Sequence, residues 1–474
     1  MPEQYDYDAV IVGAGPNGLA AAITLARAGC STLVLEGKDT IGGGARSMEL
    51  TRPGFIHDVC SAIHPLGVGS PFFRSIPLGD FGLEWVYSPL SFAHPLDGGR
   101  AVVLERSIEA TAGKLGADGA AYRRLMSPMV SNWKSLLDDT LGPLSIPRHP
   151  FLLARFGLVA LQSASGLSRR LFRGEEARAL FAGLAAHSIL PLEHGMTAAI
   201  GLMEGILGHA VGWPMARGGS QAIIDAMAAY LQSMGGVIQT GVSVNSLKDL
   251  PSARATLLNV TPKQLLSIAG DRLPAGYRGK LERYRYGPGV FKIDYALDGP
   301  APWQAPECEQ AATLHLGGTL EEIAYSESAI WRGEHAENPF LILVQHSPFD
   351  RSRAPEGGHT AWVYCHVPSG STVDMTGRIE AQIERFAPGF RERILDRYVR
   401  GPAEFEAYNP NYVGGDIIGG VQDLAQQFAR PTLKRVPYAI PVKGLYLCSS
   451  STPPGGGVHG MCGYFAAKAA LRGM

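Results

Sequence analysis

Short apolar runs near the N-terminus predict strands separated by a helix. Residues 9–12 and 32–35 are apolar and partly β-branched, which is typical of strands buried on both faces. Between them, residues 16–28 form a mostly apolar stretch that predicts a helix ending at Gly29. The order of strand, helix and strand predicts a unit with two parallel strands.

The first strand and helix lie within an uncharged stretch, residues 9–26, that is long enough to span a bilayer. It contains glycines and a proline, however, and acidic residues precede it where a secretory signal carries cations. We therefore expect no targeting signal, no transmembrane helix and a cytoplasmic protein.

The rest of the chain divides into helical and strand-rich stretches. Apolar positions recur at helical spacing between about residues 105 and 205. Residues 290–297, 340–345 and 360–367 are short β-rich runs, and alternation places Trp362, Tyr364 and His366 on one face of the last run. A helix to about residue 233 is followed by a strand over 237–240, and a further strand over 445–448 precedes a helix that starts near residue 462.

Charge and cysteine spacing exclude several classes of protein. The net charge is −1, with 42 Lys and Arg against 43 Asp and Glu, so we expect no extended nucleic-acid surface. The six cysteines lie far apart without a C-x-x-C pair, which predicts free thiols instead of a disulfide framework or a metal site. The same spacing argues against disulfide reductase chemistry.

Glycines with the G-x-G-x-x-G spacing follow the first predicted strand. Gly13 permits a tight turn, Gly15 lets the backbone approach a pyrophosphate, and Gly18 lets the helix pack against the strand. Pro16 suits the first position of the helix, whose N-terminus points at the anion. Glu36 ends the second strand, where its carboxylate is placed to bind a ribose diol. These residues predict a dinucleotide site.

A second glycine-rich turn just after Glu36 indicates that the dinucleotide is FAD. We expect Gly43 and Gly44 to reinforce contacts to the pyrophosphate and the ribityl chain. Arg46 is expected to neutralise phosphate charge and Ser47 to hydrogen-bond it. A flexible loop without a ligand is the alternative interpretation.

Two further glycine clusters are expected to reach the same cofactor. The C-terminal strand leads into a glycine-rich turn that is expected to contact the ribityl chain and the isoalloxazine. The central helix opens with a similar cluster, and Val242 after it is placed to pack against adenine, with scaffold packing as the alternative. The expected contacts are Arg217, Gly218 and Val242 in the central cluster, and Gly456, Gly457 and Val458 in the C-terminal one.

The chain resembles the phytoene desaturase and carotenoid isomerase-like flavoproteins, in particular the branch named for a pyridine nucleotide-disulfide oxidoreductase domain. The resemblance rests on the N-terminal fingerprint, PMARGGSQAI, YGPGVFKIDYALDGPAPW, NPNYVGGDIIGG and STPPGGGVHGMCGYFAAKAAL. It covers nearly the whole chain and implies FAD and an amine-oxidase-like architecture. The chain departs from many flavoproteins where residues 448–451 replace a Gly-Asp pair, which implies that a serine, Ser450, contacts the ribityl chain.

Pattern and resemblance together predict an α/β fold with a Rossmann-like FAD-binding domain and a discontinuous substrate domain of helices and sheet. We expect residues 1–90, 206–275 and 411–474 to build the FAD-binding domain. Residues 91–205 are the expected helical part of the substrate domain, and residues 276–410 its sheet.

Two titratable residues are candidates for catalysis. His459 lies inside the C-terminal glycine turn, close to the expected ring position, and a local hydrogen bond that shapes the turn is the alternative. Lys292 alternates with apolar residues in its strand, and in related amine oxidases a sheet lysine holds a water near the flavin. His57, Asp58 and His64 follow the second turn, and we interpret them as structural, with a place in the lining of the flavin pocket as the alternative.

The expected function is that of a FAD-dependent oxidoreductase (a desaturase, saturase or isomerase) acting on carbon–carbon bonds of a hydrophobic polyene or lipid. Flavin-dependent amine oxidation is one alternative, because the same architecture supports it. A FAD-bearing binding protein with little turnover is another.

An arginine-rich stretch suggests where the protein meets a partner. Residues 140–174 contain five arginines and no acid, interleaved with apolar residues. A basic amphipathic segment at residues 148–173 predicts peripheral membrane contact. An inward-packing helical cap, or the subunit interface of a homo-oligomer, is the alternative.

Overall fold

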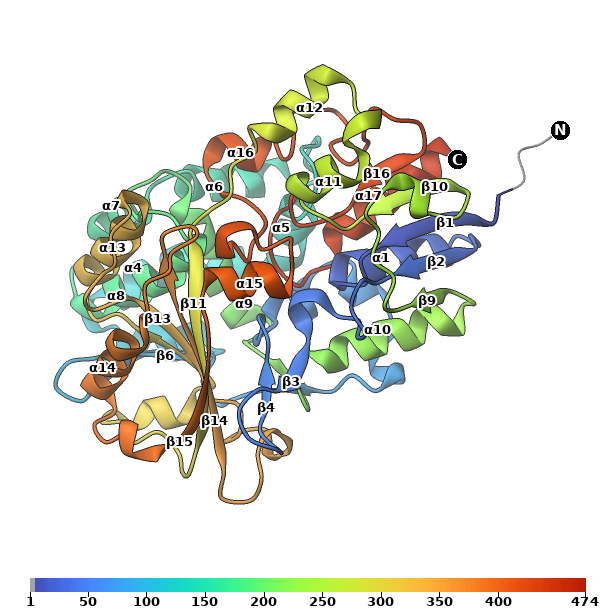
Figure 1. Ribbon diagram of the computed structural model, residues 1–474. Coiled ribbons are helices and arrows are strands. Elements are labelled where there is room, and N and C mark those ends of the chain that lie inside the picture. The colour runs from blue at the N-terminus through green and yellow to red at the C-terminus, as the bar shows by residue number, and fades with distance from the viewer. Residues whose placement is uncertain (1–4) are drawn as a thin grey trace.

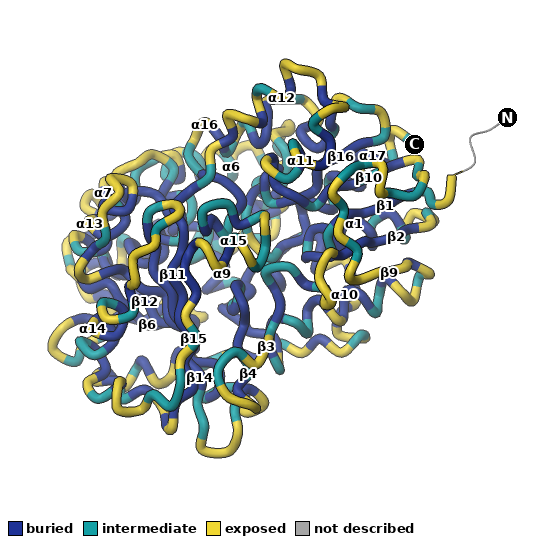
Figure 2. The backbone as a smooth tube through the Cα atoms, viewed as in Figure 1, coloured by how far each residue is buried: buried dark blue, intermediate teal, exposed yellow. Residues whose placement is uncertain are grey.

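Two sheets organise the chain, and Figure 1 shows them on opposite sides of the molecule. The computed structural model describes residues 5–474, so residues 1–4 of the expected segment 1–90 lie outside the described part. In Figure 2 the central strands of both sheets are buried, and the exposed backbone lies at the periphery. The α/β fold expected from the sequence is confirmed.

The first sheet is parallel throughout, with the strand order β16-β10-β1-β2-β9. Its strands are β1 (Tyr7–Val12), β2 (Thr32–Leu35), β9 (Val237–Gln239), β10 (Ala253–Leu258) and β16 (Leu445–Leu447). N-terminal, central and C-terminal segments therefore share one sheet. Because β1 lies at its centre, the residues that follow β1 lie at the middle of the carboxyl edge.

Helices α1 (Pro16–Ala26), α10 (Gln221–Ser233) and α17 (Met461–Gly473) pack on this sheet. Their apolar positions share one core with β1, which includes Ile11, Ile23 and Ile224. A Cβ atom at Gly463 would lie only 1.8 Å from the Asn17 carbonyl oxygen, so glycine allows α1 and α17 to cross closely. The crossing lies near the starts of both helices, each of which follows a glycine turn.

The second sheet has the order β15-β11-β14-β13-β12-β6-β7. Its strands are β6 (Phe92–Leu96), β7 (Arg100–Leu104), β11 (Gly289–Leu297), β12 (Thr313–Leu316), β13 (Leu341–Val344), β14 (His359–Val367) and β15 (Ile394–Arg400). The alternation predicted for β14 is confirmed, because Trp362 and Tyr364 join one hydrophobic core while Ala361 and Val363 join another.

Helices cover the Trp362 face of this sheet, so the helical prediction for residues 105–205 is confirmed. They are α3 (Ile108–Lys114), α4 (Gly119–Val130), α5 (Trp133–Thr140), α6 (Pro150–Ala160), α7 (Ala164–Leu171), α8 (Glu175–Ala185) and α9 (Thr197–Ala210). Within residues 5–474, no single helix has the length and apolar character needed to cross a membrane. Helices α6 and α7 reach that length and composition only when they are taken together, and they are bent by 93° relative to each other.

Short elements connect the two sheets. The second glycine turn leads into a hairpin of β3 (Ser47–Glu49) and β4 (Ile56–Asp58), followed by α2 (Pro65–Gly69). The remaining helices are α11 (Pro262–Ala269), α12 (Ala275–Glu282), α13 (Leu320–Ala329), α14 (Thr376–Phe386), α15 (Pro402–Tyr408) and α16 (Leu424–Phe428).

All six cysteines are free thiols, as their spacing predicted.

Candidate functional site

One cavity of about 610 Å³ extends from the carboxyl edge of the parallel sheet to the face of the second sheet. Gly13 and Glu36, which directly follow β1 and β2, lie at one end, and Trp362 and Tyr364 of β14 lie at the other. Of the predicted cofactor contacts, the lining includes Gly13, Gly15, Pro16, Glu36, Gly43, Gly44, Arg46, Val242, Ser450, Gly457 and Val458.

The two N-terminal glycine turns pack directly against each other at one end of the cavity, where both are part of the lining. Gly13 has a φ of +95°, which L-residues rarely adopt. A Cβ atom at Gly43 would lie 3.3 Å from the Cα of Gly15. Gly18 lies behind this surface, since its Cβ would lie 1.9 Å from the Gly13 carbonyl oxygen. No side chain of these glycines keeps a ligand away from the backbone of the turns, as the close contact with a pyrophosphate requires.

Glu36 is held in place at the end of β2. Its carboxylate accepts hydrogen bonds from the backbone N–H groups of Ala14 at 2.9 Å and Lys38 at 3.1 Å. Its backbone oxygen accepts a bond from the Val242 N–H at 2.9 Å, which brings Val242 beside the cavity. With 8% exposure and a place in the lining, Glu36 has acceptor capacity left for a ribose diol.

Arg46 also lines the cavity, but other groups already bind its guanidinium. It donates to the Glu36 carboxylate at 3.2 Å, to the Ile41 carbonyl at 3.2 Å and to the Tyr408 hydroxyl at 3.0 Å. Its charge is therefore balanced by Glu36, and the side chain holds the second glycine turn against α15.

The C-terminal turn brings Ser450, Gly457 and Val458 into the same cavity. Gly457 lies beside α2, because a Cβ there would lie 3.1 Å from a methyl carbon of Leu66. Gly456 is not part of the lining, and a Cβ there would lie 3.0 Å from the Cβ of Ile418. Cofactor contact at Gly456 is thus replaced by packing against Ile418.

The two candidates for catalysis do not line the cavity. Both ring nitrogens of His459 are used inside the turn, Nε2 with the Gly455 carbonyl at 3.1 Å and Nδ1 as acceptor for the Met461 N–H at 3.0 Å. Burial lowers the pKa of His459 to about 4, so the ring is neutral at pH 7. Of the two interpretations of His459, the structure favours the one in which it shapes the turn.

Lys292 is buried beside the aromatic wall of the cavity, because it pairs with Tyr364 across β11 and β14 and so shares a face of the sheet with it. Its ammonium group pairs with Asp294 and lies 5.5 Å from the ring centre of Trp362. Burial lowers the pKa of Lys292, although the Asp294 charge opposes the shift. Burial likewise raises the pKa of Asp294 to about 6. The pair packs beside Trp362 on the same face of the sheet.

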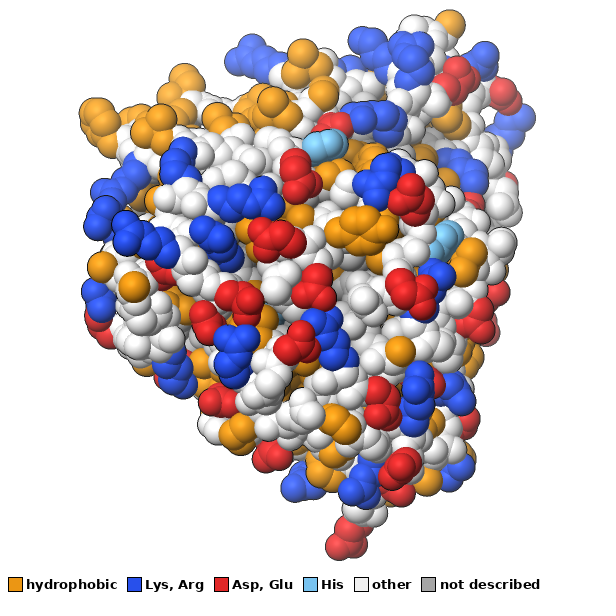
Figure 3. All heavy atoms as spheres, turned by 90° about the vertical axis from the view of Figure 1, so that its left-hand side faces the viewer, with side chains coloured by type: hydrophobic (Ala, Val, Ile, Leu, Met, Phe, Trp, Pro, Cys, Tyr) orange, Lys and Arg blue, Asp and Glu red, His pale blue; other side chains and the backbone are white. Residues whose placement is uncertain are grey.

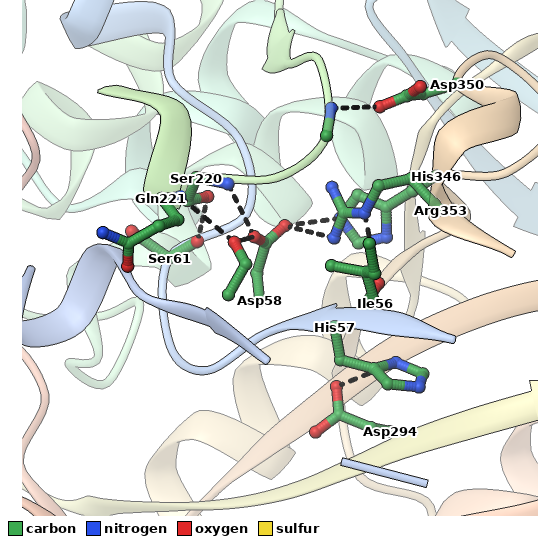
Figure 4. A network of polar contacts seen from close by, with 12 residues as sticks. Ile56, His57, Asp58, Ser61, Ser220, Gln221, Asp294, His346, Asp350 and Arg353 are labelled. Carbon is green, nitrogen blue, oxygen red and sulfur yellow. Dashed lines mark hydrogen bonds and ion pairs between the residues drawn. The ribbon is translucent and has the colours of Figure 1, made fainter. Parts of the chain in front are cut away.

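A buried polar network around Asp58 joins three distant segments, as Figure 4 shows. Its carboxylate accepts hydrogen bonds from Ser47 Oγ at 2.6 Å, the Ser220 N–H at 2.8 Å and Arg353 Nη2 at 2.9 Å. Burial favours the neutral acid, but Arg353, His346 and Ser47 together outweigh burial and hold the pKa of Asp58 well below its usual range. His57 points to the other side of β4, where its Nδ1 lies 3.6 Å from the Asp294 carboxylate.

This network explains why three predicted cofactor contacts lie elsewhere. Ser47 donates to Asp58, and the Gly218 N–H donates to the Asp350 carboxylate at 2.7 Å. Arg217 is half-exposed and pairs with Glu84 at 2.7 Å. These three residues are outside the cavity lining, and the central segment reaches it through Val242 instead.

Asn259, Trp213 and Glu204 are among the cavity residues that were not foreseen from the sequence. Asn259 follows β10, and its Nδ2 donates to the Gly13 carbonyl at 3.3 Å. Trp213 and Glu204 line the end nearest β14. The sequence could have indicated a functional role for Glu204, because it is the lone charged residue of the apolar run 197–208.

Comparisons with known proteins agree with this geometry. Residues 11–74 match a family model described as an NAD(P)-binding Rossmann-like domain. The chain is 26% identical to pyridine nucleotide-disulfide oxidoreductase domain-containing protein 2 of Rattus norvegicus, over 98% of this chain and 94% of that protein. It is 25% identical to a neurosporene-forming phytoene desaturase of Rhodobacter capsulatus, over 96% and 92% of the two chains.

Solved structures show the same fold. An oxidoreductase from Methanosarcina mazei aligns with a TM-score of 0.67 at 16% identity, over 98% of this chain and 99% of that chain. A putrescine oxidase bound to putrescine aligns with a TM-score of 0.62 at 17% identity, over 98% and 99%. The architecture is therefore amine-oxidase-like, and the Rossmann-like part indicates a flavin or nicotinamide dinucleotide. The chain is an oxidoreductase and a full-length homologue of pyridine nucleotide-disulfide oxidoreductase domain-containing protein 2 and of the phytoene desaturases.

Proposed function

We propose that this oxidoreductase uses FAD to transfer hydrogen at carbon–carbon bonds of a hydrophobic polyene or lipid, as a desaturase, a saturase or an isomerase. The observation that carries the proposal is the continuity of one cavity. It runs from Gly13 and Glu36, past Gly457, to the aromatic wall at Trp362 and Tyr364. A nucleotide held at the first end places its ring system towards the second.

Enclosure by distant segments supports FAD over a nicotinamide cofactor. The cavity is lined by residues that follow β1, β2 and β10 and by the turn before α17, so the bound group is wrapped by N-terminal, central and C-terminal parts of the chain. Such a site suits a cofactor that stays bound through turnover. FAD supplies the hydride acceptor and donor, while the protein binds it, orients it and excludes water.

The end of the cavity near β14 supports a hydrophobic substrate. Most of its lining is aromatic or aliphatic. This part of the wall is formed by Trp213, Ile342, Val344, Trp362 and Tyr364, to which Thr313, His187 and Glu204 add polar groups. Trp362 and Tyr364 contact each other edge-to-face, with ring centres 5.1 Å apart. A flat or extended apolar ligand fits such a chamber better than a strongly solvated one. The names of the phytoene desaturase relatives support the same substrate class.

Anaerobic titration of the FAD-loaded protein tests the proposal. Oxidised and photoreduced samples are titrated with polyenes, unsaturated and saturated lipids, and amines, and the flavin absorbance is followed. We expect apolar compounds to change the flavin spectrum. Bleaching by amines alone, with peroxide release in air, would establish amine oxidation. A spectrum that none of these compounds alters would favour a binding protein with little turnover.

Peripheral membrane contact through residues 148–173 is a second part of the proposal. Figure 3 shows apolar side chains along the upper edge of the face on which α6 and α7 lie in Figure 1, with cationic side chains below them. Around α6, Ile146, Phe151 and Leu158 are 94%, 89% and 77% exposed. Arg148 and Arg155 are exposed beside them, and no acid lies within residues 140–174. This combination fits the interface of an anionic membrane.

The position of α6 links this surface to the substrate. α6 packs directly against α9, which carries Glu204 at the cavity. The surface around α6 is thus one helix away from the chamber, and we propose this side for the entry of an apolar substrate dissolved in the bilayer.

Vesicle binding tests the membrane contact. The double variant Arg148→Ser/Arg155→Ser should bind phosphatidylserine-containing vesicles more weakly, by about 1 kcal/mol per removed cation. Its binding should also depend less on salt, because screening acts on these charges. The matched control Arg351→Ser/Arg393→Ser removes exposed cations outside the segment and should behave as wild type. Wild-type protein that never binds such vesicles would contradict the contact.

A further inference from the structure

Glu204 is an isolated acid in the substrate end of the cavity. It lies on α9, where residues 197–208 carry no other charge. The cavity lining includes Glu204 together with His187, Trp213 and Tyr364. Glu204 is partly exposed and yet desolvated by the surrounding protein, so the space it is exposed to is the cavity itself.

The side-chain carboxyl group of Glu204 has no hydrogen-bond or ion-pair partner among residues 5–474. Its backbone carbonyl, within α9, accepts a hydrogen bond from Trp213 Nε1 at 3.4 Å. Burial is the cause that raises the pKa of Glu204 to about 7. An unpaired, desolvated carboxyl group lowers the stability of the fold unless a ligand uses it. Nothing else in the described part of the chain uses this group.

The titratable groups around Glu204 do not change their charge near pH 7. His64 and His187 line the same cavity, and burial lowers their pKa values to about 4 and about 3, so both are neutral at pH 7. Burial raises the pKa of Tyr364 far above neutrality, and Tyr122 on α4 is bonded to His209. Glu204 is therefore the group at this end of the cavity whose charge changes near pH 7.

Charged residues on the elements packed against α9 do not change the pKa of Glu204. Burial is the only cause of the Glu204 shift, so none of these residues contributes to it. On the packed elements α4, α5, α6, α7, α8 and β7 they are Arg123, Arg124, Lys134, Asp138, Asp139, Arg155, Arg169, Arg170, Glu175, Glu176, Arg178 and Arg100.

We propose that Glu204 takes up and releases the proton of the reaction in the substrate chamber. The inference rests on the proposed function. When a carbon–carbon single bond becomes double, one C–H hydrogen leaves with its electron pair as hydride, for which FAD is the acceptor. The neighbouring carbon loses a proton to the Glu204 carboxylate, and the C–H electron pair forms the second C–C bond. In the saturation direction, Glu204 returns the proton.

A carboxyl group that titrates near neutrality suits this role. General acid–base catalysis works best when the pKa of the group lies close to the working pH. The histidines of the lining, His64 and His187, are weaker bases because burial lowers their pKa values, so Glu204 is the proton acceptor best suited to a substrate carbon near pH 7.

Proton-linked binding of an apolar probe tests the proposal without a known substrate. The probe is diphenylhexatriene, an uncharged polyene, added to FAD-loaded protein between pH 5 and 9. Its trimethylammonium derivative is the cationic comparison. The variants are Glu204→Gln, which cannot titrate, and Glu204→Asp, which can. Glu193→Gln, an exposed acid outside the cavity, is the matched control. FAD content is measured for each protein before the probe is added.

We expect the apolar probe to exclude water from Glu204, which favours the neutral acid. The wild-type Kd should then be constant below pH 7 and rise above it, by at most about tenfold per pH unit. Glu204→Gln should bind the probe with a Kd that is independent of pH, and Glu204→Asp should restore the dependence. With a compound that reduces the flavin, Glu204→Gln should slow the reduction about 100-fold and remove its dependence on pH near 7.

Other outcomes would overturn the inference separately from the proposed function. A wild-type Kd that does not change with pH, with the FAD content intact, would remove Glu204 from proton exchange. Tighter binding of the cationic probe above pH 7, lost in Glu204→Gln, would make Glu204 a cation anchor instead. If the apolar probe does not bind to FAD-loaded wild type or Glu204→Gln, the claim that the chamber binds apolar ligands is wrong, and the inference about Glu204 is wrong with it.

Discussion

Single residues decide how the nucleotide end of the cavity works, and Glu36 is the clearest case. Its carboxylate is fixed by the Ala14 and Lys38 N–H groups and by Arg46, and it still faces the cavity. The sequence predicted this position because strand, glycines, helix and acid follow one another within a short stretch, where local geometry determines the result.

Replacement of Glu36 tests its role directly. Glu36→Ala removes an acceptor for the ribose diol and leaves Arg46 without its charge partner. We expect the Kd for FAD to rise about 10- to 100-fold, the size of a lost charge-assisted hydrogen bond. Quenching of FAD fluorescence on binding measures the change. Glu49→Ala removes an exposed carboxylate of β3 and should leave FAD affinity intact. Unchanged affinity in Glu36→Ala would remove Glu36 from the site.

Other residues could not be placed from the sequence, because their partners lie outside the glycine motifs, in two of three cases more than 100 residues away. Ser47 donates a hydrogen bond to Asp58, Arg217 forms an ion pair with Glu84, and the Gly218 N–H donates to Asp350. Short-range spacing suggested cofactor contacts for these residues but contains no information about such acceptors. Local spacing succeeds for the glycines because their role concerns the backbone.

At the scale of elements, the crossing of α1 and α17 holds two glycine turns together. Gly463 is the contact point, since a Cβ there would lie 1.8 Å from the Asn17 carbonyl oxygen. The sequence predicted both helices but not their contact, since nothing local to either helix shows which distant helix it packs against.

Gly463→Ala should force α1 and α17 apart. We expect the free energy of unfolding to fall by about 1–3 kcal/mol from overpacking, and FAD affinity to fall as well. Urea unfolding followed by circular dichroism measures the first effect. The control Gly113→Ala is also in a helix, α3, but its Cβ would meet no atom within 4 Å. It should be stabilised by about 0.5–1 kcal/mol. Equal stability of the two variants would contradict the close crossing.

Strand predictions show which elements the sequence determines. β1, β2, β11 and β14 were predicted because they are apolar, β-branched and buried along nearly their whole length. β6 was missed because it contains Pro95, which argues against a strand inside a sheet. β15 was missed because it is half-exposed and carries charges, as an edge strand does.

For the whole molecule, buried neutral histidines make stability depend on pH. Burial lowers their pKa values, to about 2 for His57, about 3 for His187, and about 4 for His64, His94, His209, His346 and His459. Between the unfolded value of 6.5 and these folded values, the unfolded chain binds more protons than the native state. Stability is therefore lost as the pH falls from about 6.5 towards 4.

We expect the free energy of unfolding to be lower at pH 5 than at pH 7 by about 2 kcal/mol or more, the effect of a single such histidine. Asp294 and Glu204, whose pKa values burial raises to about 6 and about 7, act in the opposite sense but are fewer. Urea titrations of the FAD-loaded protein at the two pH values measure the difference. Equal or greater stability at pH 5 would show that these histidines are protonated in the native state.

The central claim for the whole molecule is that three separated segments enclose one flavin dinucleotide beside an apolar chamber. The absorbance spectrum of the purified protein, read with analysis of the cofactor released on denaturation, tests this claim most directly. The account predicts a yellow protein that releases stoichiometric FAD and oxidises little NAD(P)H. A colourless protein that cannot take up FAD would contradict it.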